Sequence, residues 1–198
     1  IAEGSWGWGS CFIDFDNDGW QDIYQTNGWG NLPALGFPTD TSRAWVSDEA
    51  RTFTNDAAGL KLDDTEEGRG IICADFDNDG DVDILQMHLN AASGASLWMN
   101  EANANANANY LSVKLKGISP NTDGVGARIT ITTASGDKQY RDILLGNNFA
   151  SHNPTLAYFG VNTITQLSTV HVLWPDGEET TMSNVNANQM LTINHPDL

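Results

Sequence analysis

A tandem repeat with an acidic loop is the feature that most constrains how this chain can fold. The stretch from Gly7 reads GWGSCFIDFDNDGWQDIYQTN, and the stretch from Gly68 reads GRGIICADFDNDGDVDILQMH. The two align without gaps, with a period of 61 residues (68 − 7). A period of this size corresponds to one supersecondary unit, as in solenoids and propellers. We therefore expect two copies of one structural unit in the first half of the chain.

Each copy reads as a strand, an acidic loop and a second strand. Short apolar segments at 11–13 and 71–74 precede the loops, and segments at 22–26 and 83–87 follow them. Helical periodicity is weak throughout the chain, so the sequence predicts an all-β fold. We interpret residues 1–100 as two propeller-blade-like repeats.

The second half of the chain alternates apolar and polar residues with a period of two. Leu111, Val113 and Leu115 share one predicted face, and hairpin turns are expected at 135–137 and 175–177. Strands with one solvated face favour an antiparallel β-sandwich or a partly open barrel. Residues 101–109, rich in alternating Asn and Ala, read as a linker, and residues 110–198 as the sandwich domain.

The acidic loops have the spacing D-x-D-x-D-G-x-x-D, which places alternate carboxylates around one point. Glycine at position 6 permits a sharp turn that brings the position 7 carbonyl to the same point. Many hard oxygen ligands on a flexible loop favour Ca²⁺ over Mg²⁺, so the sequence predicts two calcium sites. The expected ligands are Asp14, Asp16, Asp18, Trp20 (carbonyl) and Asp22 in the first loop, and Asp75, Asp77, Asp79, Asp81 (carbonyl) and Asp83 in the second.

Two other interpretations of the loops were weighed. The loops resemble the first half of an EF-hand, but position 12 is Gln25 or Gln86 instead of Glu, and the flanking segments are strands. An EF-hand is therefore rejected. The other alternative is a pair of exposed Asp/Asn/Gly turns that bind nothing. Two loops with identical spacing in identical context favour calcium over this alternative.

The net charge of −17, from 26 acidic and 9 basic residues, limits the possible partners. It argues against nucleic acid and anionic membrane surfaces, and it favours a multivalent cation. No apolar run approaches the roughly 18 residues of a membrane span. Cys11 and Cys73 are too few for a disulfide scaffold; they could form one bridge, or remain two small buried residues.

Five tryptophans crowd the first 45 residues: Trp6, Trp8, Trp20, Trp29 and Trp45. They could stack on sugar rings or anchor a protein interface, but packing between repeats is favoured. The four histidines lack the spacing of a transition-metal site, and the chain has no nucleophile elbow or phosphate-binding loop. Calcium would also occupy the carboxylates that a glycosidase needs. We therefore predict a protein that is not an enzyme.

Motifs in both halves of the chain resemble known families. The repeats, with FTNDAAGL between them, resemble FG-GAP/VCBS-type propeller blades, which carry the same acidic pattern. The motifs GVGARITI (124–131), YFGV (158–161) and VHVLWPDG (170–177) resemble the UnbV/ASPIC C-terminal domain found in cartilage-acidic-protein-like and bacterial secreted proteins. The resemblance implies calcium-loaded blades followed by a sandwich, in families whose members are mostly non-enzymatic or uncharacterised.

A closed propeller needs several blades, and this chain carries about two. It also starts at Ile1 without an initiating Met, so we expect a processed or truncated form. Open strand edges favour pairing with another chain. The expected function is an extracellular calcium-binding structural or interaction module that self-assembles into a polymer or filament through exposed β edges. The alternative is a carbohydrate- or protein-ligand-binding adhesion domain of a larger propeller. The expected location is secreted, periplasmic or on the cell surface.

Overall fold

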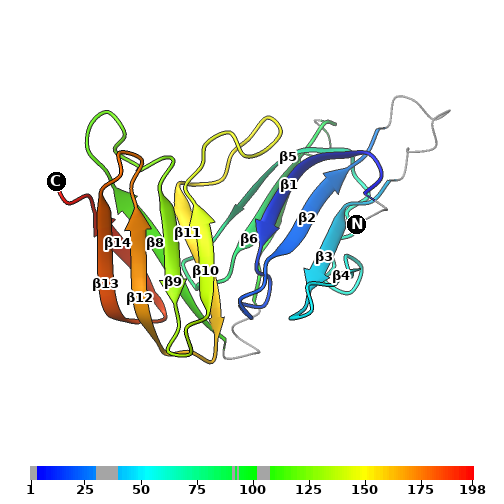
Figure 1. Ribbon diagram of the computed structural model, residues 1–198. Coiled ribbons are helices and arrows are strands. Elements are labelled where there is room, and N and C mark those ends of the chain that lie inside the picture. Colours follow the sequence, from blue (N-terminus) through cyan, green and yellow to red (C-terminus); the bar gives the residue numbers. More distant parts are fainter. Residues whose placement is uncertain (1–3, 30–39, 91, 93, 102–107) are drawn as a thin grey trace.

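The computed structural model describes residues 4–29, 40–90, 92, 94–101 and 108–198. These residues form β-strands joined by turns and loops, and none of them lies in a helix (Figure 1). The predicted all-β class is confirmed. The Asn/Ala linker predicted at 101–109 falls largely on residues 102–107, which are outside the described residues. In the described part of the chain there is also no helix of the length and apolarity needed to cross a membrane.

The N-terminal half contains two antiparallel sheets, one from each repeat. The first sheet has the order β1 (Gly7–Ile13), β2 (Asp22–Asn27), β3 (Arg43–Ser47) and β4 (Phe53–Asn55). The second has the order β5 (Gly68–Ala74), β6 (Asp83–His88) and β7 (Ala95–Trp98). In each sheet the acidic loop joins the first two strands into a hairpin.

The two hairpins have the same register. Ile13 pairs with Asp22 in the first hairpin, and Ala74 pairs with Asp83 in the second. Each hairpin also has a register shift near the start of its first strand, between Gly7 and Ser10 and between Gly68 and Ile71. The sequence repeat is thus also a repeat in backbone structure.

The two sheets pack face to face through a shared apolar core. The first sheet contributes Cys11, Ile13 and Tyr24, and the second contributes Ile71, Cys73 and Ile84. Tyr24 is completely buried, and its hydroxyl donates a hydrogen bond to Gln86 Oε1 at 2.7 Å. Cys11 and Cys73 form a disulfide across this core. Of the two possibilities for the cysteines, the bridge is the one that the structure contains.

The C-terminal half is a two-layer sandwich. One sheet has the order β10 (Lys138–Asp142), β9 (Arg128–Thr132), β12 (Gln166–Leu173) and β13 (Glu179–Asn186), and the other has β11 (Leu156–Asn162), β8 (Asn109–Lys116) and β14 (Gln189–Asn194). Leu111, Val113 and Leu115 are buried as predicted. The hairpin turns around Gly136 and Gly177 also match, and both glycines have positive φ.

One strand pair departs from the predicted antiparallel pattern. β14 lies parallel to β8, in register from Gln189 opposite Leu111 to Asn194 opposite Lys116. The preceding strand, β13, belongs to the other sheet, so the chain crosses between layers before it pairs. Such a crossover allows a parallel neighbour, whereas a tight hairpin within one sheet would force an antiparallel one.

Candidate metal centres

Both acidic loops are shaped by two residues in the left-handed backbone region. Asn17 and Asn78, at position 4, have φ of 57° and 64°. Gly19 and Gly80, at position 6, have φ of 100° and 99°. Asn tolerates this region better than most residues, and Gly adopts it without steric penalty. The identical dihedral pattern explains why the two loops need the same Asn and Gly positions.

Backbone amides hold the carboxylates of the first loop in place. The N–H of Gly19 donates to Asp14 Oδ2 at 3.0 Å, and the N–H of Asp18 donates to Asp16 Oδ1 at 3.2 Å. Asp18 Oδ1 in turn accepts from the N–H of Trp20 at 2.7 Å. One carboxylate oxygen from each of Asp14, Asp16 and Asp18 lies within 4.8 Å of the others, so the three carboxylates converge.

The second loop repeats this arrangement. Asp75 Oδ2 accepts from the N–H of Gly80 at 3.1 Å, and Asp79 Oδ1 accepts from the N–H of Asp81 at 2.9 Å. Here the carboxylate oxygens within 4.8 Å of one another come from Asp75, Asp77 and Asp83. Each loop therefore brings carboxylate oxygens of three aspartates close together. The third aspartate is Asp18, at position 5, in the first loop and Asp83, at position 9, in the second.

The aspartates at position 9 have a second role that the sequence pattern did not reveal. Asp22 accepts from the N–H of Phe15 at 2.9 Å and from the N–H of Ser47, in β3, at 2.7 Å. Asp83 accepts from the N–H of Phe76 at 2.7 Å and from that of Asn100 at 2.8 Å. Both residues thus tie their loop to a neighbouring strand or to the segment that follows the sheet.

Not all the predicted ligands meet in these clusters. Asp22 and Asp79 lie outside the two groups of three carboxylates. The Asp81 side chain is buried, and its Oδ1 accepts a hydrogen bond from Asn17 Nδ2 at 2.7 Å. This contact connects the two loops directly. The ligand predicted at this position is the carbonyl of Asp81, and the carboxylate of Asp81 makes the inter-loop contact.

The first cluster contains a buried carboxylate oxygen without a hydrogen-bond partner. Asp14 is 5% exposed, and its Oδ1 has no partner. Burial, with a further contribution from the charge of Asp18, raises the pKa of Asp14 to about 7. Burial likewise raises the pKa of Asp22 to about 6 and the pKa values of Asp75 and Asp83 above their ordinary range. These groups fit a cation, which would satisfy the orphan oxygen and offset the repulsion.

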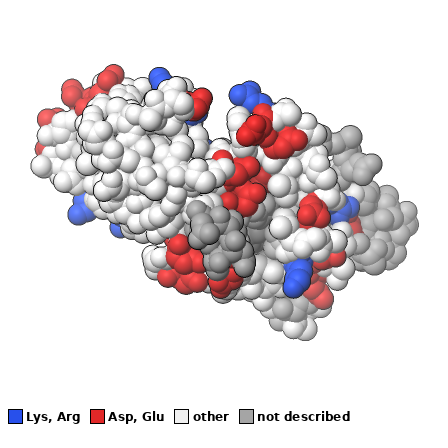
Figure 2. Space-filling model, turned by 90° about the horizontal axis from the view of Figure 1, so that it is seen from below, with Lys and Arg blue, Asp and Glu red and all other residues white. Residues whose placement is uncertain are grey.

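The C-terminal sandwich packs against both loops. The N–H of Asn162, at the end of β11, donates to the carbonyl of Asn17 at 2.8 Å. Gly160 is packed so closely that a Cβ there would lie 2.3 Å from Asp14 Oδ2. Against the second loop, a Cβ on Gly80 would overlap the ring of Tyr110. Seen from below, acidic side chains gather in the middle of the molecule (Figure 2).

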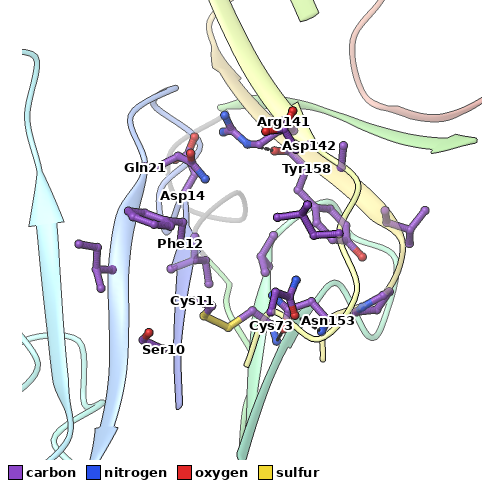
Figure 3. A pocket seen from close by; sticks show the side chains of 18 of the residues that line it. Ser10, Cys11, Phe12, Asp14, Gln21, Cys73, Arg141, Asp142, Asn153 and Tyr158 are labelled. Atoms are coloured by element: carbon purple, nitrogen blue, oxygen red, sulfur yellow. Dashed lines mark hydrogen bonds between the residues drawn. A yellow bond between two sulfur atoms is a disulfide. The ribbon is translucent and has the colours of Figure 1, made fainter. Parts of the chain in front are cut away.

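Beside the first loop, the two halves of the chain enclose a cavity of about 760 Å³ (Figure 3). Phe12 and Asp14 line one side, and Arg141 and Tyr158 line the other. The Arg141 side chain donates from Nε to the carbonyl of Tyr158 at 2.9 Å. Burial lowers the pKa of Arg141 to about 10, an effect that the charge of Asp14 opposes.

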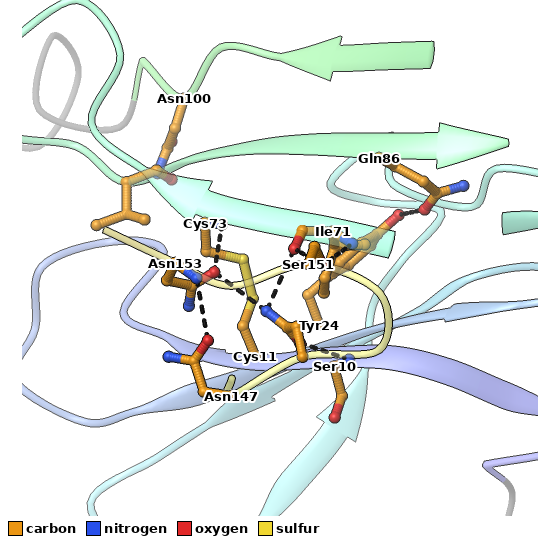
Figure 4. The surroundings of a disulfide bond; sticks show 12 residues. Ser10, Cys11, Tyr24, Ile71, Cys73, Gln86, Asn100, Asn147, Ser151 and Asn153 are labelled. Carbon is orange, nitrogen blue, oxygen red and sulfur yellow. Dashed lines mark hydrogen bonds between the residues drawn. A yellow bond between two sulfur atoms is a disulfide. The ribbon is translucent and has the colours of Figure 1, made fainter. Parts of the chain in front are cut away.

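A loop of the sandwich, residues 143–155, forms a second contact between the halves (Figure 4). Asn153 Oδ1 accepts from the N–H of Cys73 at 2.9 Å. Ser151 Oγ accepts from the N–H of Ile71 at 3.1 Å and donates to its carbonyl at 2.7 Å. Side chains of this loop therefore satisfy backbone groups along the edge strand β5, which would otherwise be open to another chain.

Three of the five tryptophans near the N-terminus, Trp6, Trp8 and Trp29, pack on one another. Trp8 stacks on Trp29 with centroids 5.3 Å apart and contacts Phe149 at 4.9 Å. Trp6 contacts Trp29 at 4.8 Å, and the guanidinium of Arg69 lies 4.2 Å from the Trp8 centroid. Ring faces of these three tryptophans are thus already in contact with protein groups. The predicted packing is between repeats, whereas these rings stack within the first repeat, and Trp8 also contacts Arg69 of the second repeat and Phe149 of the sandwich.

The comparison with known families concerns the C-terminal half. Residues 117–198 match the family model described as ASPIC and UnbV, and this match supports the resemblance of the sandwich domain. No curated protein matches the chain. The C-terminal domain is therefore similar to ASPIC and UnbV domains, and the match extends over most of the sandwich, from the residue after β8 to the end of the chain.

Proposed function

We propose that this chain is a non-enzymatic, extracellular structural module whose two FG-GAP/VCBS-type loops bind Ca²⁺, and which associates with copies of itself. The observation that carries the calcium proposal is the buried, unpartnered Oδ1 of Asp14 beside two further carboxylates. Asp14, Asp16 and Asp18 would hold one ion, and Asp75, Asp77 and Asp83 the other. Bound calcium would supply positive charge that offsets the repulsion within each cluster.

Two further features support an extracellular structural role. The Cys11–Cys73 bridge is compatible with an oxidising compartment, where such bridges persist. Calcium is plentiful outside cells, so an affinity of roughly 10⁻⁴–10⁻³ M, typical of extracellular modules, would be sufficient. The loop carboxylates are also engaged by backbone amides, which suits a structural role better than acid–base chemistry.

Calcium titration of the chelator-treated protein is the experiment that tests this function. We expect equilibrium dialysis to give two bound ions per chain, and Asp16→Asn or Asp77→Asn to leave one. The matched control is Asp123→Asn, an exposed aspartate outside both loops, which should leave two. Calcium at about 100 times its Kd should raise the free energy of unfolding by about 2.7 kcal/mol per site. Absence of saturable binding at millimolar calcium would contradict the proposal.

The pKa shifts predict how the calcium-free protein responds to pH. In the folded state the pKa values of Asp14 and Asp22 are about 7 and about 6, above the ordinary 3.8, so folding takes up protons. The free energy of unfolding in chelator is therefore expected to fall as the pH rises from about 4 to about 7. Urea denaturation across this interval measures the effect. Asp14→Asn should flatten the curve, and a stability that rises with pH would contradict the argument.

A further inference from the structure

The two N-terminal sheets pack through unlike faces, although they are repeats of one unit. We call the face of the first sheet that carries Cys11 and Tyr24 its front face. This face contacts the side of the second sheet that carries Cys73 and Gln86. One period of 61 residues relates Cys11 to Ile72, and Cys73 is the residue after that. Neighbouring residues on a strand point to opposite faces, so a front face meets a back face.

The period of 61 residues also identifies the two sheet faces that take no part in this packing. The front face of the second sheet carries Ile72 and Leu85, the equivalents of Cys11 and Tyr24. The back face of the first sheet carries Phe12 and Gln25, the equivalents of Cys73 and Gln86. Neither set contributes a buried residue to the core between the sheets. Each sheet therefore has one face that the packing between the two sheets does not use, although Trp45, opposite Ile23 on the back face of the first sheet, is itself buried.

The front face of the second sheet is an apolar surface. Ile72 pairs with Leu85, and Leu85 pairs with Leu97, which gives a row of apolar side chains across three strands. Leu97 is 53% exposed, and Met87 and Met99 beside it are 48% and 40% exposed. None of these five residues carries a charge. Contiguous exposed apolar side chains of this kind are typical of an interaction surface.

The back face of the first sheet also presents apolar side chains. Phe12 is 65% exposed, and together with Ile23 and Gln25 it lines the cavity of about 760 Å³ (Figure 3). Tyr140 and Leu144 of the sandwich face the same cavity and are also exposed. The cavity thus combines an unused sheet face with apolar side chains from the neighbouring domain, and it has room for side chains of another molecule.

We propose that the front face of the second sheet of one copy packs on the back face of the first sheet of the next copy. The contact would repeat, between molecules, the packing that already exists within the chain. Within the chain, Cys11 of the first repeat faces Cys73 of the second. In the proposed contact the second repeat takes the place of the first, and the first repeat of the next copy takes the place of the second. Ile72, the equivalent of Cys11, would therefore face Phe12 of the next copy, the equivalent of Cys73. An apolar contact would then stand where the disulfide stands within the chain.

The contact joins two different surfaces, so it is heterologous and leaves each end of a dimer able to bind another copy. It would extend the row of sheets face by face, in contrast to strand pairing at an open edge. The inference rests on the self-association part of the proposed function. It does not depend on the calcium part, because Phe12, Ile72 and Leu97, which carry the contact, are not ligands of either acidic loop, although Asp14 lines the same cavity as Phe12.

Sedimentation velocity in millimolar calcium, with one variant for each face, tests the inference. We expect the wild-type chain to form species larger than a dimer. Phe12→Lys and Leu97→Lys should each be monomeric alone. Mixed in equal amounts they should form dimers only, since each variant retains the face that the other has lost. Lysine is chosen because it lowers the net negative charge of −17, so lost association cannot be assigned to added repulsion.

A control variant and a cross-linking experiment complement the sedimentation test. Met190→Lys, in the sandwich at 47% exposure, should assemble like the wild type. Ile72→Cys mixed with Phe12→Cys should give a covalent dimer on oxidation. A monomeric wild type, or loss of assembly with Leu97→Lys but not with Phe12→Lys, would overturn the inference. Equilibrium dialysis of the same variants keeps the two proposals distinct: two bound ions with no assembly would refute only the docking, whereas no bound ion would refute the calcium proposal.

Discussion

Reduction of the Cys11–Cys73 bridge is expected to lower the free energy of unfolding of the N-terminal half by about 4 kcal/mol. The bridge joins residues separated by 62 positions, and a cross-link of this span removes much of the conformational entropy of the unfolded chain. Both cysteines are buried between the two sheets, so the cross-link acts on the contact that holds the repeats together. The urea midpoint with and without a reducing agent measures the loss.

The reduced protein should still fold, because the contact has other components. Tyr24 remains buried and bonded to Gln86, and the apolar core between the sheets does not require the sulfur–sulfur bond. The variant with both Cys11→Ala and Cys73→Ala should lose more than reduction alone, since it also removes two buried sulfur atoms. The transition of the C-terminal sandwich, which has no cysteine, serves as the internal control. Equal midpoints in the oxidised and reduced protein would contradict the expectation.

The repeat and its loops were predictable from sequence because their causes are local. Alternation with a period of two sets the strands, and the Asn and Gly positions set the turn between them. The hairpin registers at Ile13–Asp22 and Ala74–Asp83 follow from the loop length. The predicted strands are each part of a longer one, because backbone pairing continues past the apolar residues, as in β1, which starts at Gly7.

How the two repeats pack against each other could not be predicted from the sequence in the same way. Nothing in the local pattern says that Cys11 faces Cys73, one residue beyond its repeat equivalent. That offset depends on which faces of two twisted sheets fit together, which is a property of packing between distant residues. The sandwich strand β14 illustrates the same limit, since its parallel pairing with β8 depends on a crossover between layers.

The candidate site was also only partly predictable. The acidic pattern identified the residues of both clusters, but it did not indicate that the sandwich would pack against the loops. Gly160 and Asn162 lie more than a hundred residues from the first loop, and their contact with Asn17 has no signature in either segment. β11 packs closely on the part of the loop where Asp14 is buried and its Oδ1 has no hydrogen-bond partner.

Gly160→Ala is expected to weaken calcium binding at the first loop while leaving the second loop intact. A Cβ at this position would lie 2.3 Å from Asp14 Oδ2 and 2.4 Å from the Cα of Asn17, and both distances are shorter than real contacts. Overpacking of this kind costs about 1–3 kcal/mol. The strain can be relieved only by moving β11 away from the loop or by displacing Asp14 from its cluster.

Terbium luminescence measured in the Asp77→Asn background, which leaves one site, isolates the first loop; tryptophan excitation alone would not, because the loops touch through Asn17 and Asp81. We expect Gly160→Ala to lower the terbium affinity of the first loop by roughly tenfold, which corresponds to about 1.4 kcal/mol, within the range of the strain. Gly4→Ala is the matched control, since a Cβ there meets only the flexible end of Gln25, at 3.6 Å. An unchanged affinity in Gly160→Ala would mean that β11 can retreat without disturbing Asp14. The sandwich would then cover the first loop without determining its geometry.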